Sequence, residues 1–181
     1  SQPLFLYIIL KTIFETNMEN KIGIYLNNKL GTELLSKIKD IGINHEDLNK
    51  FGDIIINKDL YVYIGDKIEV KKSSNGKYYF QDFEYNKDVY FENKRDLIKV
   101  IVMRTLYSKR HDNDFYLKQV KKLFISFFHI IEIINKHPNF SDSKINLSNL
   151  LQNIEAYVVL DLIAKDVSNK FNKIPLFSKH D

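Results

Sequence analysis

The stretch that decides the fold runs from Lys94 to Lys136 and reads KRDLIKVIVMRTLYSKRHDNDFYLKQVKKLFISFFHIIEIINK. Apolar residues recur in it at intervals of three and four, which is the spacing of one face of an α-helix. The polar stretch HDND divides it, and this predicts a helix over Lys94–Tyr107 followed by a longer, largely buried helix that Pro138 ends. We expect the apolar face of this pair to be the centre of the fold.

Capping residues predict where these and other helices begin. Asn93 suits the N-cap of the first helix of the pair, and Asp112 or Asn113 suits that of the second. The apolar run Leu4–Leu10 indicates a buried helix near the N-terminus, and Asn44 is placed to cap a short helix after it. We therefore expect helices on both sides of the middle of the chain.

The residues from Asp53 to Phe91 change to the alternating pattern of β-strands, rich in Ile, Val, Tyr and Phe. Asn75-Gly76 is a strong hairpin signal, because both central residues of a type I′ turn need positive φ. Pairing across this turn predicts one buried face. The residues expected on it are Ile68, Val70, Tyr79, Gln81 and Phe83.

The other face would expose the aromatic residues Tyr78, Phe80 and Tyr85. Exposed aromatic rings on a sheet can stack on the bases of RNA. Aromatic rings on a sheet more often pack against side chains of the neighbouring strand. We favour this structural interpretation over base stacking.

These patterns predict an α+β fold: a mostly helical single domain, residues 1–181, with a small antiparallel β-meander or hairpin in the middle. Within it we expect N-terminal helices over residues 1–52, the β-meander over 53–92 and a helical core over 93–172. The last helix contains AYVVLDLIA, which is apolar all round except for Asp161. No apolar run reaches the roughly 20 residues of a membrane-spanning helix.

The composition excludes several kinds of site. The chain has no cysteine, which removes disulfides, cysteine-ligated zinc and thiol catalysis. Its five histidines do not approach one another at metal-ligand spacing, and the common phosphate-loop, nucleophile-elbow and calcium-loop motifs are missing. We therefore expect no metal and no cofactor.

Basic side chains suggest where an anionic partner would bind. The formal charge is +4 and the sequence pI is about 9.0, a modest excess that favours such a partner. It gathers in the helix pair, which holds all three arginines of the chain. The candidate binding residues are Arg95, Arg110, Lys118, Lys121 and Lys122.

The turn of the helix pair carries a second candidate site. Arg104 and His111, in RTLYSKRH, have six residues between them, which resembles the R-x(4–6)-H motif of the HEPN superfamily of helical ribonucleases and nucleic-acid-associated proteins. The resemblance implies RNA cleavage without metal by two motifs that meet across a dimer. His111 would activate the ribose 2′-hydroxyl and Arg104 would hold the scissile phosphate.

A structural interpretation explains the same residues. Arg104 and Arg110 would lie on the solvent side of a helix C-terminus, where the helix dipole favours cations, and His111 would belong to a polar turn. We consider this interpretation the stronger one.

The function that we expect is therefore that of a non-enzymatic binding protein, which recognises another protein or a nucleic acid. Abundant Lys, Asn and Ile indicate an AT-rich genome, such as that of a virus, a mobile element or a parasite. The alternative is a HEPN-like metal-independent endoribonuclease acting through Arg104 and His111. A homodimer is compatible with either function, and the cytoplasm or the interior of a host cell is the location that we favour.

Overall fold

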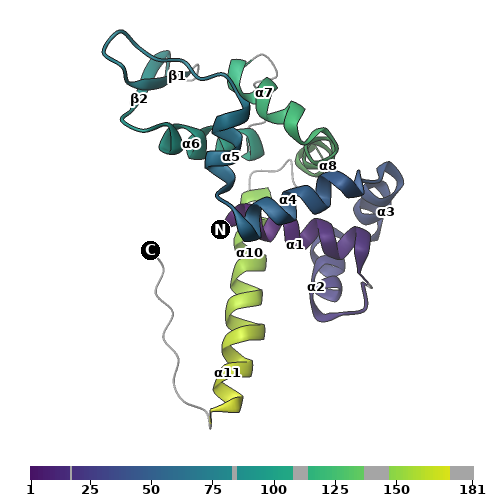
Figure 1. The fold of residues 1–181 in the computed structure, drawn as a ribbon. Coiled ribbons are helices and arrows are strands. Elements are labelled where there is room, and N and C mark those ends of the chain that lie inside the picture. The colour runs from purple at the N-terminus through teal and green to yellow at the C-terminus, as the bar shows by residue number, and fades with distance from the viewer. Residues whose placement is uncertain (17, 83–84, 108–113, 137–146, 172–181) are drawn as a thin grey trace.

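The first helix, α1 (Gln2–Glu15), lies in the middle of the molecule (Figure 1). The structure is a computed structural model that describes residues 1–16, 18–82, 85–107, 114–136 and 147–171. Leu6, Ile9 and Leu10 are almost completely buried. The helices that contact α1 are α2 (Lys21–Leu30), α3 (Thr32–Ile41), α4 (His45–Asn57) and α10 (Leu147–Ala156). The buried N-terminal helix predicted from Leu4–Leu10 is confirmed.

The helix α6 (Lys94–Tyr107) begins and ends where the sequence predicts. Its N-terminus is capped by Asn93, whose side-chain oxygen accepts a hydrogen bond from the Asp96 backbone N–H at 2.8 Å. Leu97, Ile98 and Ile101 are buried on one side of this helix. Its apolar face therefore belongs to the core, as expected.

The second helix of the predicted pair is two helices, α7 (Phe115–Leu123) and α8 (Ile125–Lys136). Phe124 leaves helical geometry, with φ −143° and ψ 59°. Its ring is buried and meets Phe51 edge-on at 5.2 Å and Phe127 at 5.7 Å. The prediction of one continuous helix is therefore wrong. The chain changes direction at Phe124, where the buried ring packs against Phe51 and Phe127. The N-cap of α7 is Asp114, whose carboxylate accepts hydrogen bonds from the Tyr116 and Leu117 N–H groups, so the predicted cap at Asp112 or Asn113 is wrong.

The first part of the predicted β-meander is helical instead. Helix α4 continues to Asn57, and α5 (Leu60–Lys67) follows it. The Asp59 carboxylate caps α5 by accepting hydrogen bonds from the backbone N–H groups of Tyr61 and Val62. The meander predicted to begin at Asp53 is therefore wrong over residues 53–67.

The remaining part contains a hairpin, but not the one predicted across Asn75-Gly76, because the strand partners of residues 78–82 are residues 87–91 and not residues 68–71. The face predicted to be buried is also the wrong one. Strands β1 (Tyr78–Asp82) and β2 (Lys87–Phe91) pair antiparallel. At Asn75-Gly76 only the glycine has positive φ, +81°, and its N–H donates to the Ser73 carbonyl, so the turn is not type I′. Phe80 is 4% exposed, whereas Tyr79 is half-buried and Gln81 is exposed. Phe83 lies outside the described residues.

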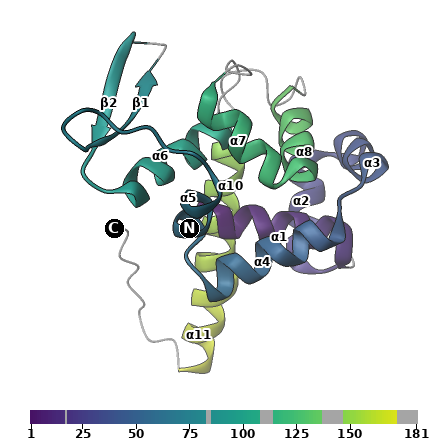
Figure 2. The same ribbon diagram turned by 45° about the horizontal axis from the view of Figure 1, so that its top comes forward.

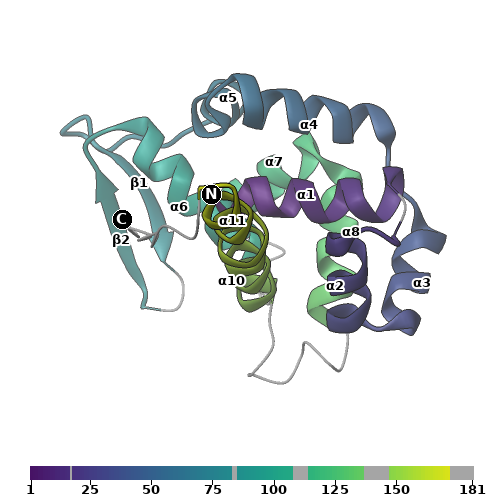
Figure 3. The ribbon, with the colours of Figure 1, turned by 90° about the horizontal axis from the view of Figure 1, so that it is seen from below.

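The hairpin packs on α6 at one end of the molecule, and α2 and α3 lie at the other end (Figure 3). Residues 69–71, which lie between α5 and the hairpin along the chain, do not form a strand. The described residues are thus mostly helical with a two-stranded antiparallel sheet in the middle of the chain, which confirms the predicted α+β class.

The last helix is continuous from α10 through a π-helical stretch, η1 (Tyr157–Ala164), into α11 (Lys165–Lys170). Its first part is buried against α1, α6 and α8, and its second part projects away from the body (Figure 2). Asp161 lies on the exposed side and pairs with Lys165 at 2.6 Å.

Candidate binding surface at the α7–α8 junction

Arg95 and Arg104 do not share a surface with the lysines of α7. Arg95, at the start of α6, forms an ion pair with Asp59 at 2.7 Å and lies over the Tyr61 ring. The hydrogen bond from Arg95 is the main cause that lowers the pKa of the Asp59 carboxyl below its usual value. Arg95 therefore joins α6 to the capped start of α5.

Arg104 lies near the other end of α6 and holds the hairpin. Its guanidinium is 3.2 Å from the Asp82 carboxylate and 4.6 Å from the centre of the Phe80 ring. The Arg104 and Asp82 side chains are 22% and 13% exposed. These contacts indicate a structural role for Arg104, but its predicted position on the solvent side of the helix is wrong, because the side chain packs against the hairpin. His111 and Arg110 lie outside the described residues, so the HEPN resemblance stays a prediction.

The three predicted lysines lie together on α7. Lys118 and Lys122 are exposed, and Lys121 reaches across to α8, where its amino group pairs with Glu132 at 2.8 Å. Because α7 and α8 meet at an angle, the last turn of α7 and the first turns of α8 enclose a surface hollow. The residues that line it are Lys121, Lys122, Ile125, Phe128, His129 and Glu132.

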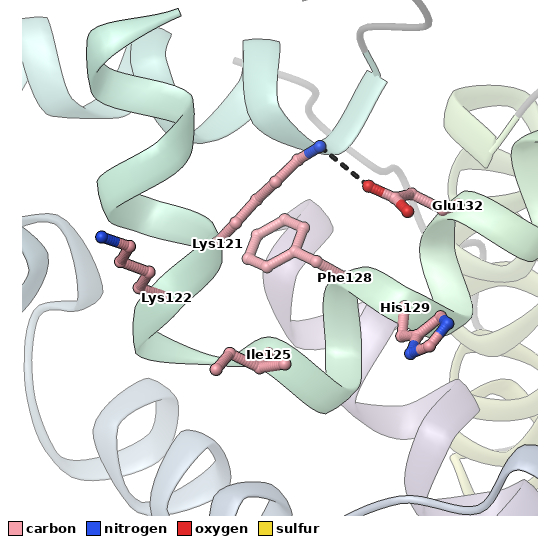
Figure 4. A pocket seen from close by; sticks show the side chains of 6 residues that line it. All are labelled: Lys121, Lys122, Ile125, Phe128, His129 and Glu132. Atoms are coloured by element: carbon pink, nitrogen blue, oxygen red, sulfur yellow. Dashed lines mark hydrogen bonds and ion pairs between the residues drawn. The ribbon is translucent and has the colours of Figure 1, made fainter. Parts of the chain in front are cut away.

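Figure 4 shows this hollow with Phe128 at its centre, between Lys121 on one side and His129 on the other. Phe128 is 7% exposed and forms an apolar floor. Ile125 is 65% exposed at the lip. Ile125 and Phe128 therefore give the hollow an apolar part next to its lysines, the combination of apolar and polar groups that ligand sites use.

A second hollow adjoins the first and shares Ile125 and His129 with it. Its other residues come from the loop between α3 and α4 and from α4 itself: Ile41, Gly42, Ile43, Asn44 and Asp47, with Ser126 of α8. The Ser126 hydroxyl donates to the Asp47 carboxylate at 3.3 Å, which joins α8 to α4. We call the two adjoining hollows the junction groove.

Among the groove residues that the sequence analysis did not select as binding residues are Ile41, Ile125 and His129. Ile41 is 45% exposed although the periodicity predicts it on the apolar face of α3. Ile125 lies outside the buried face of α8. Its position out of phase with the other apolar residues of the helix was the one sequence feature that could have indicated its exposure. Their proximity depends on how α8 meets the α3–α4 loop, which no local pattern gives.

Two further kinds of site are not found in the part of the chain that the structure describes. No three His, Asp or Glu side chains there gather closely enough to hold a metal ion. No helix there has the length and apolar character that crossing a membrane requires.

A comparison of the chain with family models, curated proteins and solved structures finds no match. The fold and the groove therefore define only a class: a helical α+β protein with an open groove, basic on one side and aliphatic at its lip.

Proposed function

We propose that this protein is a non-enzymatic binding protein that recognises a segment of another protein in the junction groove. The observation that carries the proposal is Ile125, 65% exposed in a groove whose neighbouring rim residues include Lys122 and His129. An apolar side chain of a partner would cover Ile125, and an acidic side chain next to it would pair with Lys122.

The aliphatic residues favour a protein partner over a nucleic acid. Single-stranded nucleic acids bind by stacking bases on exposed aromatic rings and by placing phosphates along a basic track. The groove offers isoleucines at Ile41 and Ile125 instead, and its one phenyl ring, Phe128, is buried. Lys121 is already engaged by Glu132, and Asp47 adds negative charge to the far wall. Such a mixed rim suits a peptide with both apolar and acidic residues.

A selection from a displayed library of random peptides tests the proposal. We expect the selected sequences to combine an aliphatic or aromatic residue with a neighbouring Asp or Glu. Ile125→Asp and Lys122→Glu should each weaken binding on the order of tenfold or more, because they act at the centre of the contact. Ile56→Asp is the matched control, since Ile56 is also 65% exposed but lies on α4 outside the groove.

A parallel titration with labelled single-stranded RNA and DNA separates the two partner classes. Binding to either that falls steeply with salt, is lost in Lys122→Glu and is unchanged in Ile125→Asp would replace the peptide with a nucleic acid. Selected peptides that bind Ile125→Asp as well as the unchanged protein would rule out the groove.

The HEPN-like ribonuclease is our second proposal and rests on the sequence motif alone. It is tested by incubating the protein with labelled single-stranded RNA in the presence of EDTA. Cleavage that is lost in both Arg104→Ala and His111→Ala would support it. No cleavage, or cleavage that neither substitution affects, would end it.

A further inference from the structure

The projecting part of the last helix, Tyr157–Phe171, has no buried residue, and we call it the arm. The buried residues of this helix, Leu147, Leu150, Leu151 and Ile154, all precede it. At its base the Tyr157 ring stacks on Tyr25 at 4.3 Å, and the Tyr157 hydroxyl donates to the Lys21 carbonyl at 3.4 Å. Beyond this anchor the arm extends into solvent (Figures 1 and 2).

One side of the arm is an apolar row. Val159, Ile163, Val167 and Phe171 follow one another at intervals of four residues, which makes them neighbours on a helix. Val159 packs at the edge of the core, and the row runs outward from it until Ile163 is 54% and Phe171 is 60% exposed. The next row contains Leu160, Ala164 and Ser168, so small and apolar residues lie beside the first row.

The charged residues of the arm lie outside these two rows. Asp161 pairs with Lys165 at 2.6 Å, and Asp166 pairs with Lys170 at 2.7 Å. The arm is therefore amphipathic, and beyond Val159 its first apolar row, Ile163, Val167 and Phe171, is not packed against the described hydrophobic core. A helix with one long apolar side normally buries it against another element.

The distribution of charge identifies what covers this side. The end of the arm near the body carries Asp161, with Glu155 just before the arm, whereas the outer end carries Lys165, Asp166 and Lys170 and has a net charge of +1. Antiparallel pairing with an identical arm places each acidic end along a lysine-bearing end, and parallel pairing places like charges together. The arm is thus complementary to itself in the antiparallel orientation.

A membrane surface fits these charges less well. Helices that lie in the membrane interface have a polar side rich in lysine and arginine, which attracts anionic lipids. The two lysines of the arm are balanced by Asp161 and Asp166, and each is already paired.

We propose that the arm is a self-association site, where the apolar row pairs antiparallel with the same row of a second copy of this chain. The contact is isologous, since both copies contribute the same residues. It does not include the junction groove, so this proposal and the proposed function can fail separately.

Sedimentation of the full chain over a range of concentrations tests the association. The mass should rise from 21.5 kDa towards twice that value as the concentration increases. Ile163→Asp and Phe171→Asp should each keep the protein at 21.5 kDa, because a carboxylate in the row must be desolvated on pairing. Ile56→Asp, an exposed isoleucine on α4, should dimerise as the unchanged chain does. Circular dichroism confirms that each variant is folded.

Disulfide trapping tests the orientation, and the chain has no cysteine of its own to interfere. The apolar row from Val159 to Phe171 is centred midway between Ile163 and Val167, so antiparallel pairing places Ile163 of one copy beside Val167 of the other. Ile163→Cys should therefore form a disulfide when it is mixed with Val167→Cys, whereas Phe171→Cys should form none with its own copy. Efficient trapping of Phe171→Cys with itself would overturn the antiparallel arrangement.

Two results would overturn the association itself. One is a mass that stays at 21.5 kDa at every concentration. The other is a monomer that floats with vesicles of phosphatidylcholine and phosphatidylserine and stops floating in Ile163→Asp, which would make the arm a membrane-binding helix.

Discussion

Arg104 attaches the hairpin to α6 through its ion pair with Asp82 and its position over the Phe80 ring. Both partners are shielded from solvent, so the pair is screened less than one on the surface. We expect Arg104→Ala to lower the free energy of unfolding by about 1–3 kcal/mol, as measured by urea denaturation. Arg104→Lys should recover only part of the loss, because lysine lacks the planar group that lies over a ring.

A double-mutant cycle with Asp82→Asn assigns this loss. If Arg104 acts through Asp82, the combined variant should lose less than the sum of the two single losses. If Arg104→Ala were as stable as the unchanged chain, Arg104 would have no structural role, and the ribonuclease proposal would be strengthened.

Tyr107, the last residue of α6, gives the stability a dependence on alkaline pH. Burial raises the pKa of Tyr107 to about 12, although nearby Ser148 opposes the rise, and the hydroxyl makes no hydrogen bond of ordinary geometry to a described residue. The unfolded chain loses this proton near pH 10, before the folded chain does, so stability present below about pH 10 is lost as the pH rises towards 12. The loss from this group is at most about 3 kcal/mol.

Tyr107→Phe should remove this contribution. Its free energy of unfolding should fall less steeply above about pH 10 than that of the unchanged chain. Near neutral pH it should differ by less than about 1 kcal/mol, because the removed hydroxyl makes no hydrogen bond of ordinary geometry to a described residue. Denaturation series at several pH values measure both differences, and identical slopes would contradict the expectation.

At this scale the sequence predicts helix caps well, because a cap depends on the residues next to it. Asn44 and Asn93 cap the helices that follow them, as expected. Arg95 was expected to bind a partner, and Arg104 to hold a phosphate under the ribonuclease alternative. Their sequence neighbours gave no sign of Asp59 and Asp82, which lie 36 and 22 positions away.

Among the elements, α7 takes the place of a missing strand beside the hairpin. The Tyr116 hydroxyl donates to the Tyr79 carbonyl at 2.8 Å and accepts from the Lys71 backbone N–H at 2.9 Å. The Gln119 amide oxygen accepts from the Glu69 N–H at 2.8 Å. Residues 69–71 are therefore held mainly by side chains of a helix, and their backbone pairs with β1 only where the Tyr79 N–H donates to the Lys71 carbonyl at 3.3 Å.

Tyr116→Phe removes the first two of these hydrogen bonds and leaves their backbone groups in a partly buried place. We expect a loss of about 1–3 kcal/mol in the free energy of unfolding. Hydrogen exchange should quicken at Lys71 and through β1, with α8 unchanged. Gln119→Ala should cost less, since its hydrogen bonds to Glu69 are exposed. Uniform faster exchange throughout the chain would mean that the effect is not local.

The errors of prediction at this scale have one cause, which is that short apolar runs fit more than one period. Leu60, Ile64 and Ile68 are four residues apart and all buried, so the helical spacing was present beneath the strand-like alternation. Asp59, a residue that favours helix N-caps, was the feature that could have distinguished a helix from a strand here. The buried face of the hairpin was inverted because its register was set from the wrong turn.

For the whole molecule, the sequence predicts the class and part of the site. Lys121 and Lys122 were selected for their charge, and both line the junction groove. The groove itself depends on a contact between α8 and the loop before α4, segments that are about 80 residues apart along the chain. The central place of α1 likewise results from contacts with helices at both ends of the sequence.

This arrangement predicts that the chain unfolds as one unit without needing the arm. Leu10 is completely buried in α1, which contacts both the N-terminal helices and α10. Leu10→Ala should lower the free energy of unfolding by about 2–5 kcal/mol. The helical circular dichroism and the tyrosine fluorescence should still fall at one shared, lower Tm.

Ile163→Asp is the matched variant, because it changes an apolar residue outside the core. Its Tm should equal that of the unchanged chain at concentrations where both are monomers, since pairing of arms would otherwise raise the Tm of the unchanged chain by mass action. Two separate transitions in Leu10→Ala would contradict a single domain. A lower Tm for monomeric Ile163→Asp would mean that the arm supports the core as well as projecting from it.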